Sequence, residues 1–130
     1  MPARPLSPHL SVYKLTYTMI SSGLNRITGL ALSLGLLLLV YWLMAVAGGA
    51  QSFARAARVL SHPLAKLVYA GLIVAFCYHL TAGIRHLVWD TGRGLERAQS
   101  HASAKLVIGV SILLSLIVGC CAYLAGALRP

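Results

Sequence analysis

The fold of this chain is decided by residues 64–89, which read LAKLVYAGLIVAFCYHLTAGIRHLVW. The stretch is almost entirely apolar, yet its last third carries His79, Arg85 and His86. A helix places residues i, i+4 and i+7 on one face, so His79, Gly83 and His86 share a face. Because a histidine inside lipid needs a partner, the pattern predicts a functional site within a membrane-spanning helix.

The composition indicates an integral membrane protein. Of the 130 residues, 58% are hydrophobic and 10% are charged, whereas a soluble domain carries about 25% charged residues. The mean hydropathy is +0.80, and the net charge of +9 comes from 11 Lys and Arg against 2 acidic residues. Since the basic residues lie mostly at the ends of apolar runs, we expect membrane lipid around them and no nucleic acid.

Three apolar runs are each long enough to cross a bilayer, which takes roughly 20 residues. We therefore expect an all-α protein with a three-helix transmembrane domain at 18–128, its helices at 18–47, 64–89 and 105–128, and polar links at 51–62 and 90–104. Residues 1–17 include prolines at positions 2, 5 and 8, which disfavour a helix and predict an extended arm.

The distribution of Lys and Arg predicts the orientation. The N-terminal side carries Arg4, Lys14, Arg26, Arg85, Arg93, Arg97 and Lys105, against Arg55, Arg58, Lys66 and Arg129 on the other side. We therefore expect a cytoplasmic N-terminus. No signal-peptide or transit-peptide pattern precedes the first apolar run, which favours a bacterial inner membrane over a mitochondrial one.

His79 is the candidate metal ligand. Counted back from Asp90, it lies roughly 16 Å deep, near the middle of the bilayer. A neutral imidazole can ligate haem iron in an apolar slot, and Gly83 one turn away leaves room for a flat group. These features predict a haem site, with a hydrogen bond to a neighbouring helix as the alternative. His86 projects from the same face about 10 Å further along, so if the haem is six-coordinate, its second axial ligand has to come from another chain.

Two further groups of polar residues suit a haem or a quinone. Arg26, Arg85 and His86 lie at a depth where they could pair with haem propionates, although Arg85 could equally extend to the lipid headgroups. Ser22 and Arg26 are i and i+4 on the first helix, with Asn25 beside them. A hydroxyl next to a guanidinium could hydrogen-bond a quinone carbonyl as it becomes anionic on reduction. Helix capping and lipid contact are the alternatives.

Three motifs occur in order: RPLSPHLSVY at 4–13, SGLNRITG at 22–29, and YH at 78–79 followed by GIRH at 83–86. Together they resemble the family of cytochrome b556 membrane-anchor subunits of succinate dehydrogenase, respiratory complex II. The resemblance covers roughly residues 4–90, and the last helix is similar only in being apolar.

The resemblance implies specific roles. Members pair with a second small membrane-anchor subunit, and one histidine from each ligates a b-type haem; His79 occupies that position. Ser22 and Arg26 correspond to the serine and arginine that line the ubiquinone site beside the iron–sulfur subunit, and in the family that arginine also lies near the haem propionates. The iron–sulfur and flavoprotein subunits would carry the succinate chemistry, while this chain would anchor them and pass electrons to quinone.

Two alternatives and one departure accompany this resemblance. A fumarate reductase anchor that uses a lower-potential quinone would have the same architecture, and a haem-free structural anchor would use His79 only to bond a neighbouring helix. The family commonly has histidine where this sequence has Asn25. Asparagine can donate a hydrogen bond but carries no charge, so the family's pairing of that position with a propionate, or its use as a proton relay, does not transfer to this chain.

Overall fold

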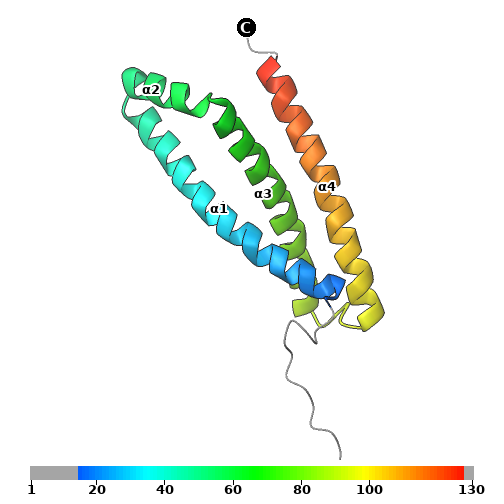
Figure 1. Cartoon of the computed structure of the whole chain (residues 1–130). Helices are drawn as coiled ribbons and strands as arrows, with labels where there is room; N and C mark the ends of the chain where they lie inside the picture. Colours follow the sequence, from blue (N-terminus) through cyan, green and yellow to red (C-terminus); the bar gives the residue numbers. More distant parts are fainter. Residues whose placement is uncertain (1–14, 128–130) are drawn as a thin grey trace, which may run out of the picture.

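Four helices and no strand make up residues 15–127, the part of the chain that the computed structural model describes (Figure 1). They are α1 (Tyr17–Ala47), α2 (Ala50–Leu60), α3 (Pro63–Asp90) and α4 (Arg97–Ala127). By length and composition, α1, α3 and α4 can each cross a membrane. The predicted all-α fold with three spanning helices is confirmed. Most of the expected N-terminal arm, positions 1–14, lies outside the described residues, as do positions 128–130.

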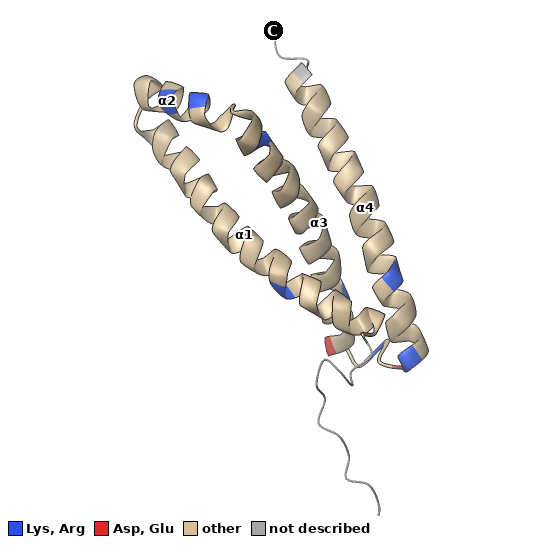
Figure 2. Ribbon diagram, viewed as in Figure 1, with Lys and Arg blue, Asp and Glu red and all other residues tan. Residues whose placement is uncertain are grey.

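The three long helices converge at one end of the molecule. The start of α1, the end of α3 and the start of α4 meet there, while α2 crosses from α1 to α3 at the opposite end (Figure 1). α3 packs against both α1 and α4. The two acidic side chains of the sequence, Asp90 and Glu96, both belong to the converging end (Figure 2).

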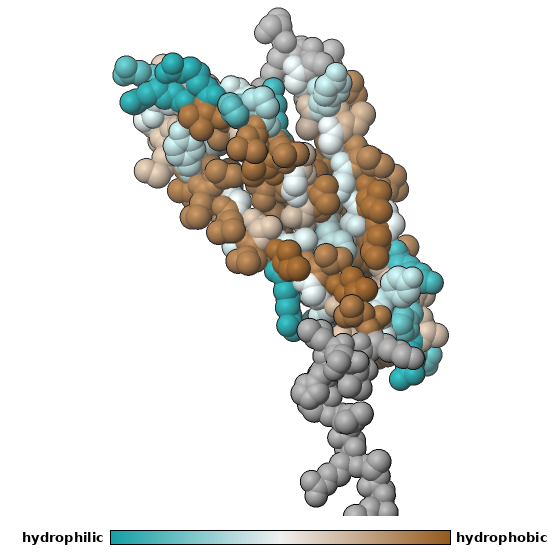
Figure 3. Space-filling model, in the orientation of Figure 1, coloured by the Kyte–Doolittle hydropathy of each residue, from teal (hydrophilic) through white to brown (hydrophobic). Residues whose placement is uncertain are grey.

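Small side chains make up most of the interior. Ala82 of α3 and Ala104 of α4 are buried, and Val107 packs with Tyr78 in a small apolar cluster. Large apolar side chains point outward along the helices, and they give the brown surface of Figure 3. In lipid, apolar side chains gain little by packing against each other, so small residues that let helix backbones approach are favoured at the interfaces.

The segment 51–62, expected as a polar link, is mostly helical. Its helix α2 follows Gly49, where the chain turns away from α1. The φ of Gly49 is 84°, a conformation that glycine adopts without strain. Ala56 is 1% exposed and faces the rest of the molecule, while Arg55 and Arg58 are exposed. The apolar and basic residues therefore separate onto different faces, a pattern that stabilises a short helix at a membrane surface.

The last helix begins at Arg97, whereas the apolar run predicted a start at 105. Its first two turns are polar, and hydropathy alone therefore placed them in a link. Ser100 and Ser103 of these turns hydrogen-bond Arg85 of α3. Tertiary contacts thus extend the helix beyond its apolar part.

Candidate functional site

His79 lies on the face of α3 that meets α1. Its Nδ1 is 3.1 Å from the main-chain carbonyl oxygen of Asn25 and 3.4 Å from the hydroxyl of Thr28. Because a carbonyl oxygen can only accept, Nδ1 carries the hydrogen of the neutral ring and Nε2 keeps its lone pair. Metal-ligating histidines usually donate their other N–H to such a carbonyl, which fixes the ring and raises its basicity.

Gly29 allows α1 to approach this imidazole. A Cβ at position 29 would lie 3.0 Å from Cε1 of His79, closer than an ordinary contact. A Cβ at Gly83, in contrast, would meet nothing within 4 Å. The imidazole is thus held tightly from the side of α1, and space remains one turn further along α3.

Arg85 lies in a different environment from His79. Only 7% of it is exposed, and its guanidinium donates to the Ser21 hydroxyl, the Ser103 hydroxyl and the Ser100 carbonyl, each at 3.0 Å. Its Cζ also lies 4.0 Å from the centroid of the Trp89 ring. Arg85 therefore joins α1, α3 and α4 instead of extending to the headgroups.

Tyr78 completes this arrangement. Its hydroxyl lies 3.0 Å from both the carbonyl oxygen and the hydroxyl of Ser21. We call the set Ser21, Tyr78, Arg85, Ser100 and Ser103 the polar junction. Since adjacent α3 residues contact positions 21 and 25 of α1, the junction and the His79 contact together fix how α1 lies along α3.

Ser22 and Arg26, the predicted quinone residues, lie beside these contacts without taking part in them. Ser22 is partly exposed and Arg26 is exposed, and neither forms a hydrogen bond with a described residue. Their neighbours Ser21 and Asn25 are the residues that bind α3. The quinone-binding role predicted for Ser22 and Arg26 remains a prediction.

Two further predicted residues have distinct surroundings. His86 is partly buried and packs edge-on against Trp89, with ring centroids 5.2 Å apart. The Oδ1 of Asn25 is buried and has no hydrogen-bond partner among the described residues. An unsatisfied buried acceptor costs about 1–3 kcal/mol.

These features fit one ligand position of a haem. The described residues contain no cluster of three or more His, Cys, Asp or Glu that could hold a metal ion by itself. Haem iron needs only axial ligands from protein, because the porphyrin supplies the others. A single imidazole with an available Nε2 and open space at Gly83 agree with one half of such a site.

The residues that the sequence pattern missed are Ser21, Gly29, Tyr78, Ser100 and Ser103. The spacing of the serines along the sequence could have indicated them. Ser21, Asn25 and Thr28 follow i, i+4 and i+7, which places them on one face of α1. Ser100 and Ser103 are i and i+3 on α4, but they fall in the segment expected as a link.

The sequence matches, over residues 1–118, the model of a family described as the succinate dehydrogenase/fumarate reductase transmembrane subunit. It is 43% identical over 114 residues to the succinate dehydrogenase cytochrome b556 subunit of Paracoccus denitrificans, covering 88% of each chain. It is 37% identical over 119 residues to the cytochrome b560 subunit of Reclinomonas americana, covering 88% of this chain and 83% of the relative. The mitochondrial cytochrome b560 subunit of Bos taurus is 36% identical over 115 residues, with 87% and 68% covered.

Proposed function

The chain belongs to the succinate dehydrogenase/fumarate reductase transmembrane subunit family, and from this premise we propose that it binds one side of a b-type haem and part of a ubiquinone site. In this role it passes electrons from an iron–sulfur subunit to quinone. The observation that carries the haem part is the contact between His79 Nδ1 and the Asn25 carbonyl oxygen, at 3.1 Å. It leaves Nε2 as the atom that ligates iron.

Each residue around His79 has a part in holding the group. The Asn25 carbonyl orients the imidazole, Gly29 lets α1 close on it, and Gly83 leaves room for the porphyrin edge. When bound, the haem supplies a one-electron carrier whose potential depends on its axial ligands and their hydrogen bonds. The second axial ligand comes from a second small membrane-anchor subunit.

Ser22 and Arg26 bind the quinone headgroup. A hydroxyl and a guanidinium that form no hydrogen bond with a described side chain can donate to a quinone carbonyl oxygen, and both interactions strengthen as negative charge develops on that oxygen. Arg26 also lies one residue from Asn25, whose carbonyl contacts His79. This short connection suits a residue that serves both the quinone and a haem propionate.

The dicarboxylate chemistry takes place on other subunits. This chain carries 2 acidic side chains in 130 residues, and proton transfer to and from a soluble substrate commonly uses positioned carboxylates or histidines. In the proposed role, the chain anchors an iron–sulfur subunit and a flavoprotein subunit to a bacterial inner membrane. Its converging end faces the cytoplasm, where the count of Lys and Arg is higher.

A reduced-minus-oxidised absorption spectrum of the chain, purified from its native membrane with the subunits it retains, tests the proposal. We expect a sharp low-spin b-type band together with flavin and iron–sulfur clusters. An intact complex without haem would contradict the role of His79 and leave the quinone role of Ser22 and Arg26 to be tested separately. A chain that retains neither haem nor partners would contradict both.

A further inference from the structure

We propose that the end of the molecule opposite the polar junction binds an anionic phospholipid. The phosphate of its headgroup pairs with Arg55 and Arg58 of α2, and an acyl chain lies in the cavity between α1, α2 and α3. This site shares no residue with the proposed haem and quinone sites and does not depend on them.

The position of α2 places it at the membrane surface. It joins the end of α1 to the start of α3, two helices that can each span a bilayer, and it lies across their ends (Figure 1). Ala56 faces inward and the two arginines are exposed. A short helix with one apolar and one basic face lies in the interface, where its cations meet lipid headgroups.

Arg55 and Arg58 have no counter-charge on neighbouring side chains. The 2 acidic side chains of the sequence are Asp90 and Glu96, which belong to the opposite end of the molecule (Figure 2). Neither guanidinium donates a hydrogen bond to a described residue. Guanidinium groups bind phosphate through paired N–H donors, so an anionic headgroup supplies what the chain itself lacks.

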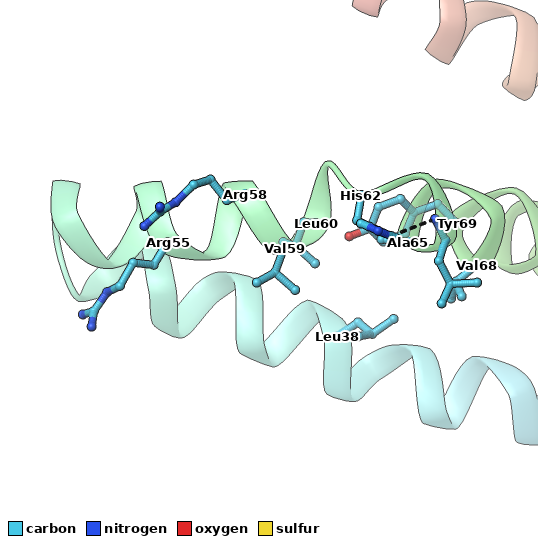
Figure 4. A pocket seen from close by; sticks show the side chains of 10 residues that line it. Leu38, Arg55, Arg58, Val59, Leu60, His62, Ala65, Val68 and Tyr69 are labelled. Atoms are coloured by element: carbon cyan, nitrogen blue, oxygen red, sulfur yellow. Dashed lines mark hydrogen bonds between the residues drawn. The ribbon is translucent and has the colours of Figure 1, made fainter.

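His62 contributes a further donor to the cavity at the junction of α2 and α3, apart from the two guanidinium groups (Figure 4). Its Nδ1 accepts from the main-chain N–H of Leu64 at 3.2 Å. The neutral imidazole therefore carries its hydrogen on Nε2, which can donate to an anion. α3 begins at Pro63, and the positive end of its helix dipole also favours negative charge here.

The cavity beside these donors has a polar edge and an apolar interior. Its volume is about 770 Å³, and its lining includes Arg55, Arg58 and His62 together with Leu38 and Val68. Figure 4 shows the guanidinium groups at the α2 end and the aliphatic side chains between the helices. A free phosphate would use only the polar edge, and an uncharged lipid only the apolar part. The combination matches a lipid that has both a phosphate with net negative charge and an acyl chain.

Native mass spectrometry of the delipidated protein, purified with the subunits it retains, tests this proposal. The protein is titrated with phosphatidylglycerol or with phosphatidylcholine of the same acyl chains. We expect tighter binding of phosphatidylglycerol, and a loss of roughly thirtyfold in the double variant Arg55→Gln/Arg58→Gln, about fivefold for each arginine. Phosphatidylcholine binding should change much less.

The matched control is Arg93→Gln/Arg97→Gln, which removes the same charge from exposed positions at the converging end. It should leave phosphatidylglycerol binding unchanged. Equal binding of the two lipids by the unaltered protein would overturn the proposal, as would an equal loss in both double variants. Should the α2 double variant fail to assemble, the single variants Arg55→Gln and Arg58→Gln decide the question.

The acyl part of the site has its own test. Ala65 lines the cavity and is partly buried, so Ala65→Phe fills the space while every charge remains. We expect this variant to bind phosphatidylglycerol at least fivefold more weakly. Unchanged binding would show that no acyl chain occupies the cavity and would overturn that part of the proposal.

Discussion

The guanidinium Nη1 of Arg85 lies 3.0 Å from the hydroxyl of Ser21, which links the end of α3 to the start of α1. The same side chain also binds Ser100 and Ser103 of α4. One arginine thus connects the three spanning helices at the end where the proposed quinone residues lie. Its role follows from these contacts and differs from that of a cation at the headgroups.

Replacing this arginine should weaken the whole assembly. Arg85→Met keeps much of the side-chain length and removes every donor, so we expect a destabilisation of about 2–4 kcal/mol and a thermal midpoint several degrees lower. Tyr78 still binds Ser21, which limits the loss. The measurement is thermal unfolding of the purified complex. The control Arg93→Met, at an exposed link position, should change little, and equal shifts in the two variants would contradict the role of the polar junction.

Removing the imidazole of His79 should remove the haem. In His79→Ala we expect the low-spin b-type band to disappear while the three helices still insert. The other imidazole on this face of α3, His86, lies about 10 Å further along and cannot replace it. The readouts are the absorption spectrum and the amount of protein in the membrane. His101→Ala, on α4, is the control and should retain the band. An unchanged spectrum in His79→Ala would falsify the ligand assignment.

The close approach of α1 can be tested at Gly29. In Gly29→Ala the new methyl group meets Cε1 of His79 at 3.0 Å, so the ring has to move by a few tenths of an ångström. We expect a shifted low-spin signal in electron paramagnetic resonance and weaker retention of haem. Gly23→Ala adds the same methyl group to the same helix where it meets nothing within 4 Å. Identical spectra in the two variants would rule out a contact between α1 and the ligand.

Arg26 should affect quinone reduction more than succinate oxidation. Arg26→Leu removes a charged hydrogen-bond donor, so we expect ubiquinone reduction to fall by at least about tenfold. Electron transfer from succinate to an artificial soluble acceptor should continue, because that acceptor takes electrons upstream of quinone. Arg93→Leu is the matched control. Normal ubiquinone turnover in the Arg26 variant would exclude this residue from the quinone site.

Hydropathy was sufficient to predict the three spanning helices, and α3 carries His79 as expected. An apolar run of this length has few other stable arrangements, since its main-chain polar groups have to be satisfied within the lipid. The prediction of a polar link at 51–62 was incomplete for a physical reason. α2 owes its helix to the separation of its apolar and basic residues, which an average over the segment conceals.

The surroundings of Arg85 could not be predicted from its own helix. Its partners are serines on α1 and α4, which lie 64 and 15 to 18 residues away along the chain. A lone arginine near the end of a spanning helix fits headgroup contact equally well until those serines are placed. The early start of α4 depends on the same contacts, because they stabilise turns that hydropathy assigns to water.

The nearer of the two partners of His79 Nδ1 is the main-chain oxygen of residue 25, which every amino acid at that position would supply. Evolution can therefore exchange the side chain there without disturbing the tautomer of the ligand. In the proposed haem site, an asparagine in place of the histidine expected from the resemblance would change the electrostatics beside the haem and leave the contact with His79 unchanged. The side chain of residue 25 can thus change the local electrostatics while its main-chain oxygen keeps the same contact with His79.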